Sequence, residues 1–145
     1  GHVAPWAEAA LYAASRAQHV EELVRPALER GAVVVCDRYV DSSVVYQGVA
    51  RGLGLRRVLD LNLAVVEGLM PDVTFLLRVE PDVAAARMRG ELDRIEREGV
   101  VFLERCAAAY DELAAGDPGR YVVVDASRPV DEIAEELRGA VRVRS

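Results

Sequence analysis

The sequence has 145 residues, 52% of them apolar, and a formal net charge of −6. This length supports one ordinary domain with a real core, and we expect residues 1–145 to form a single domain. The acidic balance argues against binding to a nucleic-acid polymer, which requires a basic surface. All 18 basic residues are arginine, so a site that needs a lysine is excluded within these residues.

The two cysteines, Cys36 and Cys106, stand without CxxC or Cys/His spacing. Neither a disulfide framework nor a zinc site is therefore indicated. Because Cys36 lies in a run of valines, we interpret it as a buried core thiol. No apolar stretch reaches the roughly 20 residues that span a bilayer, and no signal peptide opens the chain. We expect a soluble, cytoplasmic protein with no membrane partner.

Helical and strand patterns alternate along the chain. Pro5 suits the first turn of a long helix that should reach Arg30, with Gly31 as its stop. Three β-branched runs predict buried strands, at 32–36, 73–77 and 121–124. Helical patterns between and after them cover 42–50, 55–68, 81–90, 94–115 and 129–140. This alternation indicates βαβ units, and hence an α/β fold with a parallel sheet and right-handed crossovers.

Such sheets bind ligands at the carboxyl ends of their strands, here after Cys36, Val79 and Val124. Asp37 and Arg38 follow the first of these ends directly. An aspartate can hold a hydrated magnesium ion, and an arginine can bind a phosphate through two hydrogen bonds. A plain Asp–Arg pair that caps the loop is the alternative.

Aromatic and polar residues recur at helical spacing on both sides of that pair. Tyr12 and Arg16 lie four residues apart, and so on one helix face. There the ring can stack on a nucleobase while the guanidinium bonds to its edge, although an ordinary amphipathic contact fits the same spacing. A second group, which a solvated helix face explains equally well, is Ser42, Ser43, Tyr46 and Gln47.

The stretch 87–98 is dense in charges of both signs. Asp93 with Arg97 and Arg94 with Glu98 have i,i+4 spacing, so ion pairs on a helix surface are one interpretation. The other is a mobile lid whose arginines close over phosphates and neutralise the charge that moves during phosphoryl transfer. Spacing alone does not decide between them.

The order of these motifs along the chain resembles bacterial thymidylate kinase. The resemblance extends over essentially the whole chain and implies a P-loop-kinase fold, with a parallel sheet between helices on both faces in three layers. It also implies transfer of the γ-phosphate of ATP to dTMP, giving dTDP, with Mg²⁺. The matching stretches are Arg16–Val20, Gly31–Tyr39, Ser42–Ser43, Tyr46–Gly48, Arg51–Gly54, Met70–Thr74, Arg89–Glu96, Tyr110 and Val124–Ala126.

The resemblance implies a dTMP site in the first half of the chain. Tyr12 would stack on thymine, with Arg16 near the edge of the base. Arg38 would hold the acceptor phosphate and Asp37 would support magnesium through water, both as catalytic residues. The rest of the pocket would be lined by Ser43, Tyr46, Gln47 and Tyr110.

On the ATP side, the resemblance makes 87–98 a lid with two catalytic arginines, Arg89 and Arg94. Arg87 is a further candidate ATP contact, and Asp125 and Ala126 would line the adenine, largely through backbone atoms. Members of the family pair as homodimers. A candidate contact helix, whose residues could equally pack in the core, carries Leu59, Leu61, Leu63, Val65 and Val66.

The sequence departs from the family at the donor-phosphate site. The family begins with a strand and G-x-x-x-x-G-K-[ST], whose amides and lysine cradle the phosphates; neither this motif nor the strand after it is present. We therefore expect an incomplete sheet, the C-terminal two thirds of such an enzyme, and negligible phosphoryl transfer by these residues alone. Two alternatives stay open: a relative of the deoxynucleoside kinases, and a non-catalytic nucleotide-binding or dimerising fragment.

Overall fold

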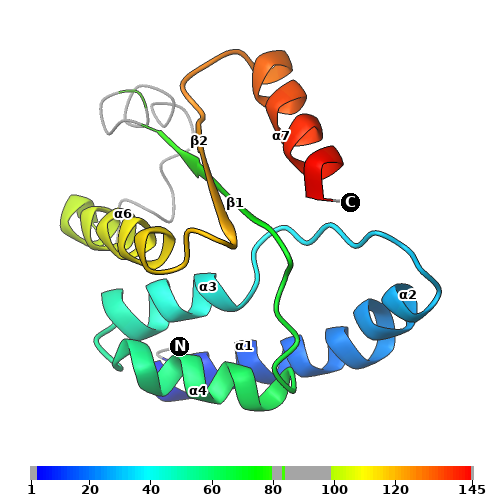
Figure 1. Ribbon diagram of the computed structural model, residues 1–145. Coiled ribbons are helices and arrows are strands. Elements are labelled where there is room, and N and C mark those ends of the chain that lie inside the picture. Colours follow the sequence, from blue (N-terminus) through cyan, green and yellow to red (C-terminus); the bar gives the residue numbers. More distant parts are fainter. Residues whose placement is uncertain (1–2, 80–82, 84–98, 145) are drawn as a thin grey trace. The chain divides into compact units, whose positions relative to one another are not determined.

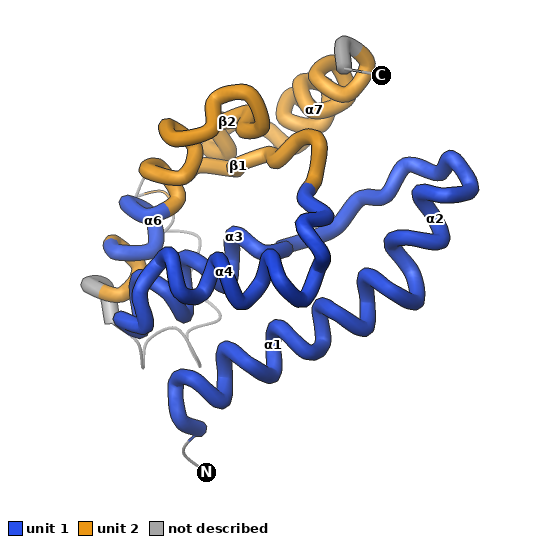
Figure 2. The backbone as a smooth tube through the Cα atoms, turned by 60° about the horizontal axis from the view of Figure 1, so that its bottom comes forward, with its two compact units in different colours: residues 1–70, 105–109 blue, residues 71–104, 110–145 orange. Residues whose placement is uncertain are grey.

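The computed structural model describes residues 3–79, 83 and 99–144. The predicted helix at 81–90, apart from residue 83, and the predicted lid at 87–98, with Arg87, Arg89 and Arg94, lie outside the described residues. The chain divides into two compact units (Figure 2). Unit 1 comprises residues 1–70 and 105–109, and unit 2 comprises residues 71–104 and 110–145.

Unit 1 begins with one continuous helical stretch, which confirms the predicted helix over 5–30. Pro5 occupies its first turn. Gly31, at φ 74°, ends it: its N–H donates to the carbonyl of Leu28 at 2.9 Å, and the N–H of Ala32 donates to that of Ala27 at 3.0 Å. The stretch consists of α1 (Pro5–His19), the π-helix η1 (Val20–Val24) and α2 (Arg25–Glu29) (Figure 1).

Residues 32–36 form a loop and not the predicted strand (Figure 1). Val33 and Val35 are 83% and 92% exposed. A strand requires a neighbour for its backbone donors and acceptors, and the sheet found among the described residues contains only two strands, neither of them this one. The interpretation of Cys36 as a core thiol is also wrong, because its side chain is exposed.

Three further helical segments complete the first part of unit 1 and confirm the helices predicted over 42–50 and 55–68. They are α3 (Val40–Ser43), the π-helix η2 (Val44–Ala50) and α4 (Leu55–Val65). Small and branched apolar side chains from these helices and from α1 are buried together, as expected for helices that share one core. The most buried are Ala9, Ala13, Val40, Val44, Val45 and Val58.

Unit 2 contains the parallel sheet. The strands β1 (Thr74–Arg78) and β2 (Tyr121–Asp125) are paired in parallel, with Thr74 opposite Tyr121 and Arg78 opposite Asp125. Two of the three predicted strands and their parallel pairing are thus confirmed. The helices α6 (Gly99–Gly116), of which 105–109 group with unit 1, and α7 (Val130–Arg144) match the predictions over 94–115 and 129–140 where they are described. Among the described helices, none is both long and apolar enough to cross a membrane.

Candidate functional site

Arg16 joins α1 to two other parts of unit 1. Its guanidinium donates to the side-chain oxygen of Asn62 on α4, and to Ser43 Oγ and the backbone oxygen of Tyr39, both at 3.2 Å. It also lies over the Tyr39 ring, with 5.6 Å between Cζ and the ring centroid. Burial lowers the pKa of Arg16, and the nearby Tyr39 hydroxyl opposes this shift. An arginine stays charged nonetheless, so unit 1 holds a partly buried cation in a defined orientation.

The loop before α3 carries the acid–base pair. Arg38 has φ 67°, a left-handed conformation that is uncommon for a residue with a side chain. Its Nε donates to Ser42 Oγ at 3.2 Å, and its guanidinium lies 4.7 Å from the centroid of the Tyr46 ring. Asp37 and Arg38 are both exposed. The backbone turn therefore presents a carboxylate and a guanidinium to solvent, where a phosphate could reach them.

Magnesium is the metal that the resemblance implies, and Asp37 is the predicted ligand. Among the described residues, His, Cys, Asp and Glu side chains form no group of three or more that could hold a metal ion. An exposed single carboxylate nevertheless fits a magnesium ion that keeps most of its water and is carried on nucleotide phosphates. It does not fit a metal cage made by the protein alone.

The other predicted dTMP-site residues of unit 1 differ in exposure. Tyr12 is 49% exposed, whereas Ser43 and Gln47 are only 2% and 5% exposed. Gln47 Nε2 donates to Glu8 Oε1 at 2.7 Å, and the Glu8 carboxylate also lies 3.7 Å from the guanidinium of Arg51. Ser43 and Gln47 thus have hydrogen-bond partners within the protein. Of these three side chains, only Tyr12 is exposed to solvent.

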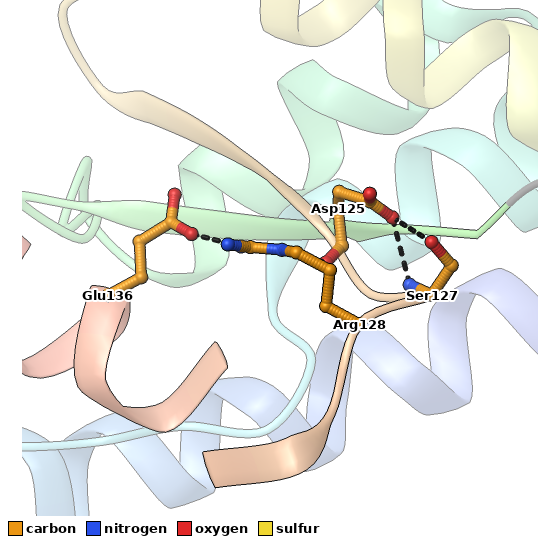
Figure 3. A network of polar contacts seen from close by, with 4 residues as sticks. All are labelled: Asp125, Ser127, Arg128 and Glu136. Atoms are coloured by element: carbon orange, nitrogen blue, oxygen red, sulfur yellow. Dashed lines mark hydrogen bonds and ion pairs between the residues drawn. The ribbon is translucent and has the colours of Figure 1, made fainter. Parts of the chain in front are cut away.

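The predicted adenine-side residues lie in unit 2, at the carboxyl end of β2 (Figure 3). The Asp125 carboxylate accepts hydrogen bonds from the hydroxyl and the backbone N–H of Ser127, the latter at 2.9 Å, and these bonds lower its pKa. Arg128 donates to the backbone oxygen of Asp125 at 3.2 Å and pairs with Glu136 on α7. The Ala126 N–H donates to the carbonyl of Arg78 at 2.7 Å. Hydrogen bonds within the turn and contacts to β1 and α7 thus hold this segment in place.

Comparison with known proteins assigns the chain to a family. The family model described as thymidylate kinase matches residues 1–137. Three similar proteins are thymidylate kinases of Leifsonia xyli subsp. xyli (55% identical over 95% of this chain and 67% of the relative), Clavibacter sepedonicus (51% over 99% and 69%) and Deinococcus radiodurans (44% over 98% and 70%).

The chain belongs to the thymidylate kinase family. The resemblance stated from the ordered motifs is therefore confirmed, and with it the kinase class and the P-loop-kinase fold. The chain spans about two thirds of the length of these relatives.

Three residues around the candidate thymidylate kinase site were not predicted from the sequence: Glu8, Tyr39 and Asn62. Asn62 had the clearest signal, because it is a single amide in a stretch of α4 that is otherwise rich in leucine and valine. Tyr39 ends the matching stretch Gly31–Tyr39, although no role was predicted for it, and Glu8 had no signal, since an acid in a first helical turn is ordinary. The structure groups Tyr12, Arg16, Asp37, Arg38, Ser43, Tyr46 and Gln47 in unit 1, whereas Tyr110, Asp125 and Ala126 belong to unit 2.

The apolar residues of α4 and Val66, which were predicted as a candidate dimer contact, are only partly accessible to a partner. Val66 is fully buried in the chain itself, so it packs in the core and cannot meet a partner. The remaining members are half-buried: Leu59, Leu61, Leu63 and Val65.

Proposed function

We propose that this chain carries the acceptor-nucleotide site of a kinase that transfers the γ-phosphate of ATP to dTMP, giving dTDP. Membership of the thymidylate kinase family supports the reaction. The observation that carries the assignment of the acceptor is the fixed guanidinium of Arg16, four residues from the exposed ring of Tyr12 on α1. An aromatic face and a donor group on one helix face are what a nucleobase requires.

The chemistry of Arg16 favours a particular base. A guanidinium only donates hydrogen bonds, so it suits a base edge that offers an acceptor. Thymine presents the O4 carbonyl at the place where cytosine presents an amino group. We therefore expect preference for dTMP over dCMP, with Tyr12 stacking on the base, Gln47 reading it, and Ser43 and Tyr46 lining the base and sugar. Tyr110 would be an aromatic residue of the pocket wall.

Arg38 would hold the acceptor phosphate, because it is exposed and its guanidinium is oriented by Ser42 and Tyr46. Asp37 beside it would hold a hydrated magnesium ion, which supplies positive charge to phosphate oxygens when bound. On the ATP side we propose Asp125 and Ala126, together with the lid arginines Arg87, Arg89 and Arg94, of which Arg89 and Arg94 would be catalytic.

Turnover requires a further element. Phosphoryl transfer depends on a cradle of backbone amides and a lysine for the donor phosphates, and these 145 residues include no G-x-x-x-x-G-K-[ST] motif and no lysine. We infer that these residues by themselves bind the acceptor nucleotide and transfer phosphate at a negligible rate. The central strand of the parallel sheet would likewise come with that element.

The test is a calorimetric titration of the 145-residue chain with dTMP, dCMP and thymidine. We expect dTMP to bind most tightly. The Arg38→Met variant should lose about 10- to 100-fold in affinity for dTMP, the usual effect of removing a charged hydrogen-bond donor, with thymidine binding unchanged. Arg56→Met is the matched control, because Arg56 is an exposed arginine of the same unit, paired only with Asp60 in the described contacts.

The alternatives give different results in the same titration. Thymidine bound as tightly as dTMP, with no effect of Arg38→Met, would replace the proposal with a deoxynucleoside kinase relative. A folded chain that binds none of the three compounds would leave the non-catalytic dimerising fragment.

A homodimer is the remaining part of the proposal. The half-buried side chains of Leu59, Leu61, Leu63 and Val65 on α4 are its candidate contact. Sedimentation equilibrium should then give twice the mass of the chain, and a Leu63→Glu variant should sediment as a monomer. A wild-type monomer at all concentrations would remove this part.

A further inference from the structure

Asn62 is an amide that is completely buried on α4, with 0% of its surface exposed. A buried amide must have partners for both ends of its side chain. Its Nδ2 donates to the carbonyl of Val58 at 2.7 Å, one turn earlier on the same helix, and its Oδ1 accepts from Arg16. Because only Nδ2 can donate to the Val58 carbonyl, Oδ1 is obliged to face Arg16. The amide is therefore fixed in orientation by its own helix.

This contact decides how the Arg16 guanidinium lies. One terminal nitrogen, Nη1, is held by Asn62, and the other, Nη2, is held by Ser43 and the backbone oxygen of Tyr39. The two anchors come from residues 46 and 27 positions away in the sequence, so they fix the plane of the group from two sides. Without Asn62 the guanidinium keeps only the Nη2 contacts and can turn about them.

We propose that Asn62 is a positioning residue that fixes the Arg16 guanidinium and thereby sets the discrimination between a base with a carbonyl edge and one with an amino edge. The inference rests on the proposed function, because it assumes that Arg16 faces the base. Asn62 itself touches no ligand: it is buried, and the protein occupies both of its polar ends. Its effect on binding passes through Arg16.

Three variants separate this role from simple core packing. Asn62→Ala and Asn62→Leu both lack the acceptor for Arg16; alanine leaves a cavity, whereas leucine fills the site with a side chain of similar size. Asn62→Asp also loses the donor to Val58 but keeps an oxygen toward Arg16. A loss of dTMP affinity that Asn62→Asp shares with Asn62→Ala and Asn62→Leu is therefore structural. A loss that appears in Asn62→Ala and Asn62→Leu but not in Asn62→Asp reports the contact with Arg16.

The experiment measures the dissociation constants of dTMP and dCMP for the 145-residue chain and the three variants by calorimetry, with urea unfolding to confirm folding. We expect Asn62→Ala and Asn62→Leu to weaken dTMP binding about tenfold, the usual effect of one lost hydrogen bond to a charged group. Binding of dCMP should stay within about twofold, so the preference for dTMP falls about tenfold. Asn62→Asp should keep that preference to within about threefold of wild type.

Two results overturn the inference. One is an equal weakening of dTMP and dCMP binding in Asn62→Leu, and the other is a preference in Asn62→Asp as low as in Asn62→Leu. Either result would make Asn62 a core residue only. If the folded wild-type chain shows no preference for dTMP over dCMP, the proposed function fails, and the role of Asn62 fails with it. The preference of the wild-type chain for dTMP over dCMP therefore distinguishes a failure of the proposed function from a failure of the role of Asn62.

Discussion

Gly48 lies at the closest approach between η2 and the beginning of α4, and its replacement by alanine tests the packing of unit 1. A Cβ at Gly48 would lie 3.2 Å from Leu55 Cα, 3.4 Å from the Gly54 oxygen and 3.5 Å from the Leu55 nitrogen. All three are backbone atoms. The Gly54 N–H also donates to the Gly48 carbonyl at 2.8 Å, so the two segments cannot separate without losing this bond.

Two opposing effects set the magnitude. Alanine in a helical position is favoured over glycine by about 0.5–1 kcal/mol, because the unfolded chain has less freedom to lose. Overpacking against atoms that cannot move aside costs about 1–3 kcal/mol. Since the nearest neighbours of Gly48 are backbone, we expect overpacking to exceed the entropic gain. The net effect of Gly48→Ala should be a loss of roughly 1 kcal/mol in the free energy of unfolding.

The assay is urea unfolding followed by the fluorescence of Trp6, the single tryptophan of the chain, which lies in unit 1. Gly139→Ala on α7 is the matched control, because nothing lies within 4 Å of its added Cβ; followed by circular dichroism, it should gain about 0.5–1 kcal/mol. A Gly48→Ala variant as stable as wild type, or more stable, would refute the reasoning about the close approach.

Three further predictions concern exposed residues. A maleimide should modify Cys36 in the native chain and leave Cys106 intact, because Cys36 is exposed and Cys106 is 4% exposed. Partial desolvation of the exposed Cys36 thiol by its neighbours raises its pKa, so its reaction should speed up as pH rises above neutrality. The hydrogen bonds from Ser127 lower the pKa of Asp125, so this carboxylate stabilises the fold above the ordinary aspartate pKa of about 4. That contribution is lost as pH falls through the lowered value, and the melting temperatures of wild type and Asp125→Asn should converge in acid; a constant difference at all pH values would contradict it. Val35→Thr should change the free energy of unfolding by less than about 0.5 kcal/mol, as for surface positions generally, because Val35 is 92% exposed; a loss of about 2 kcal/mol or more would mean that it is buried.

Local signals were enough to predict most of the helices and two strands. The helix over 5–30 begins at a proline and ends at a glycine with positive φ, and both effects act within a few residues. The runs predicted as strands at 73–77 and 121–124 lie in β1 (Thr74–Arg78) and β2 (Tyr121–Asp125), which pair with each other. The family could also be predicted from the sequence, because the order of its motifs along the chain is specific. That order does not give the geometry of the site.

Only the tertiary structure decided how those motifs are used. The run at 32–36 has the composition of a strand but forms a loop, because strand formation depends on a neighbour that a β-branched run cannot supply for itself. Arg16 finds its partner Asn62 46 residues away, at a distance in sequence where periodicity carries no information. The left-handed backbone of Arg38 was likewise not predictable from the residue type, since arginine has no preference for that conformation. The sequence by itself determined the local elements and the family, whereas the pairings between distant residues arose only when the helices packed and brought their polar groups together.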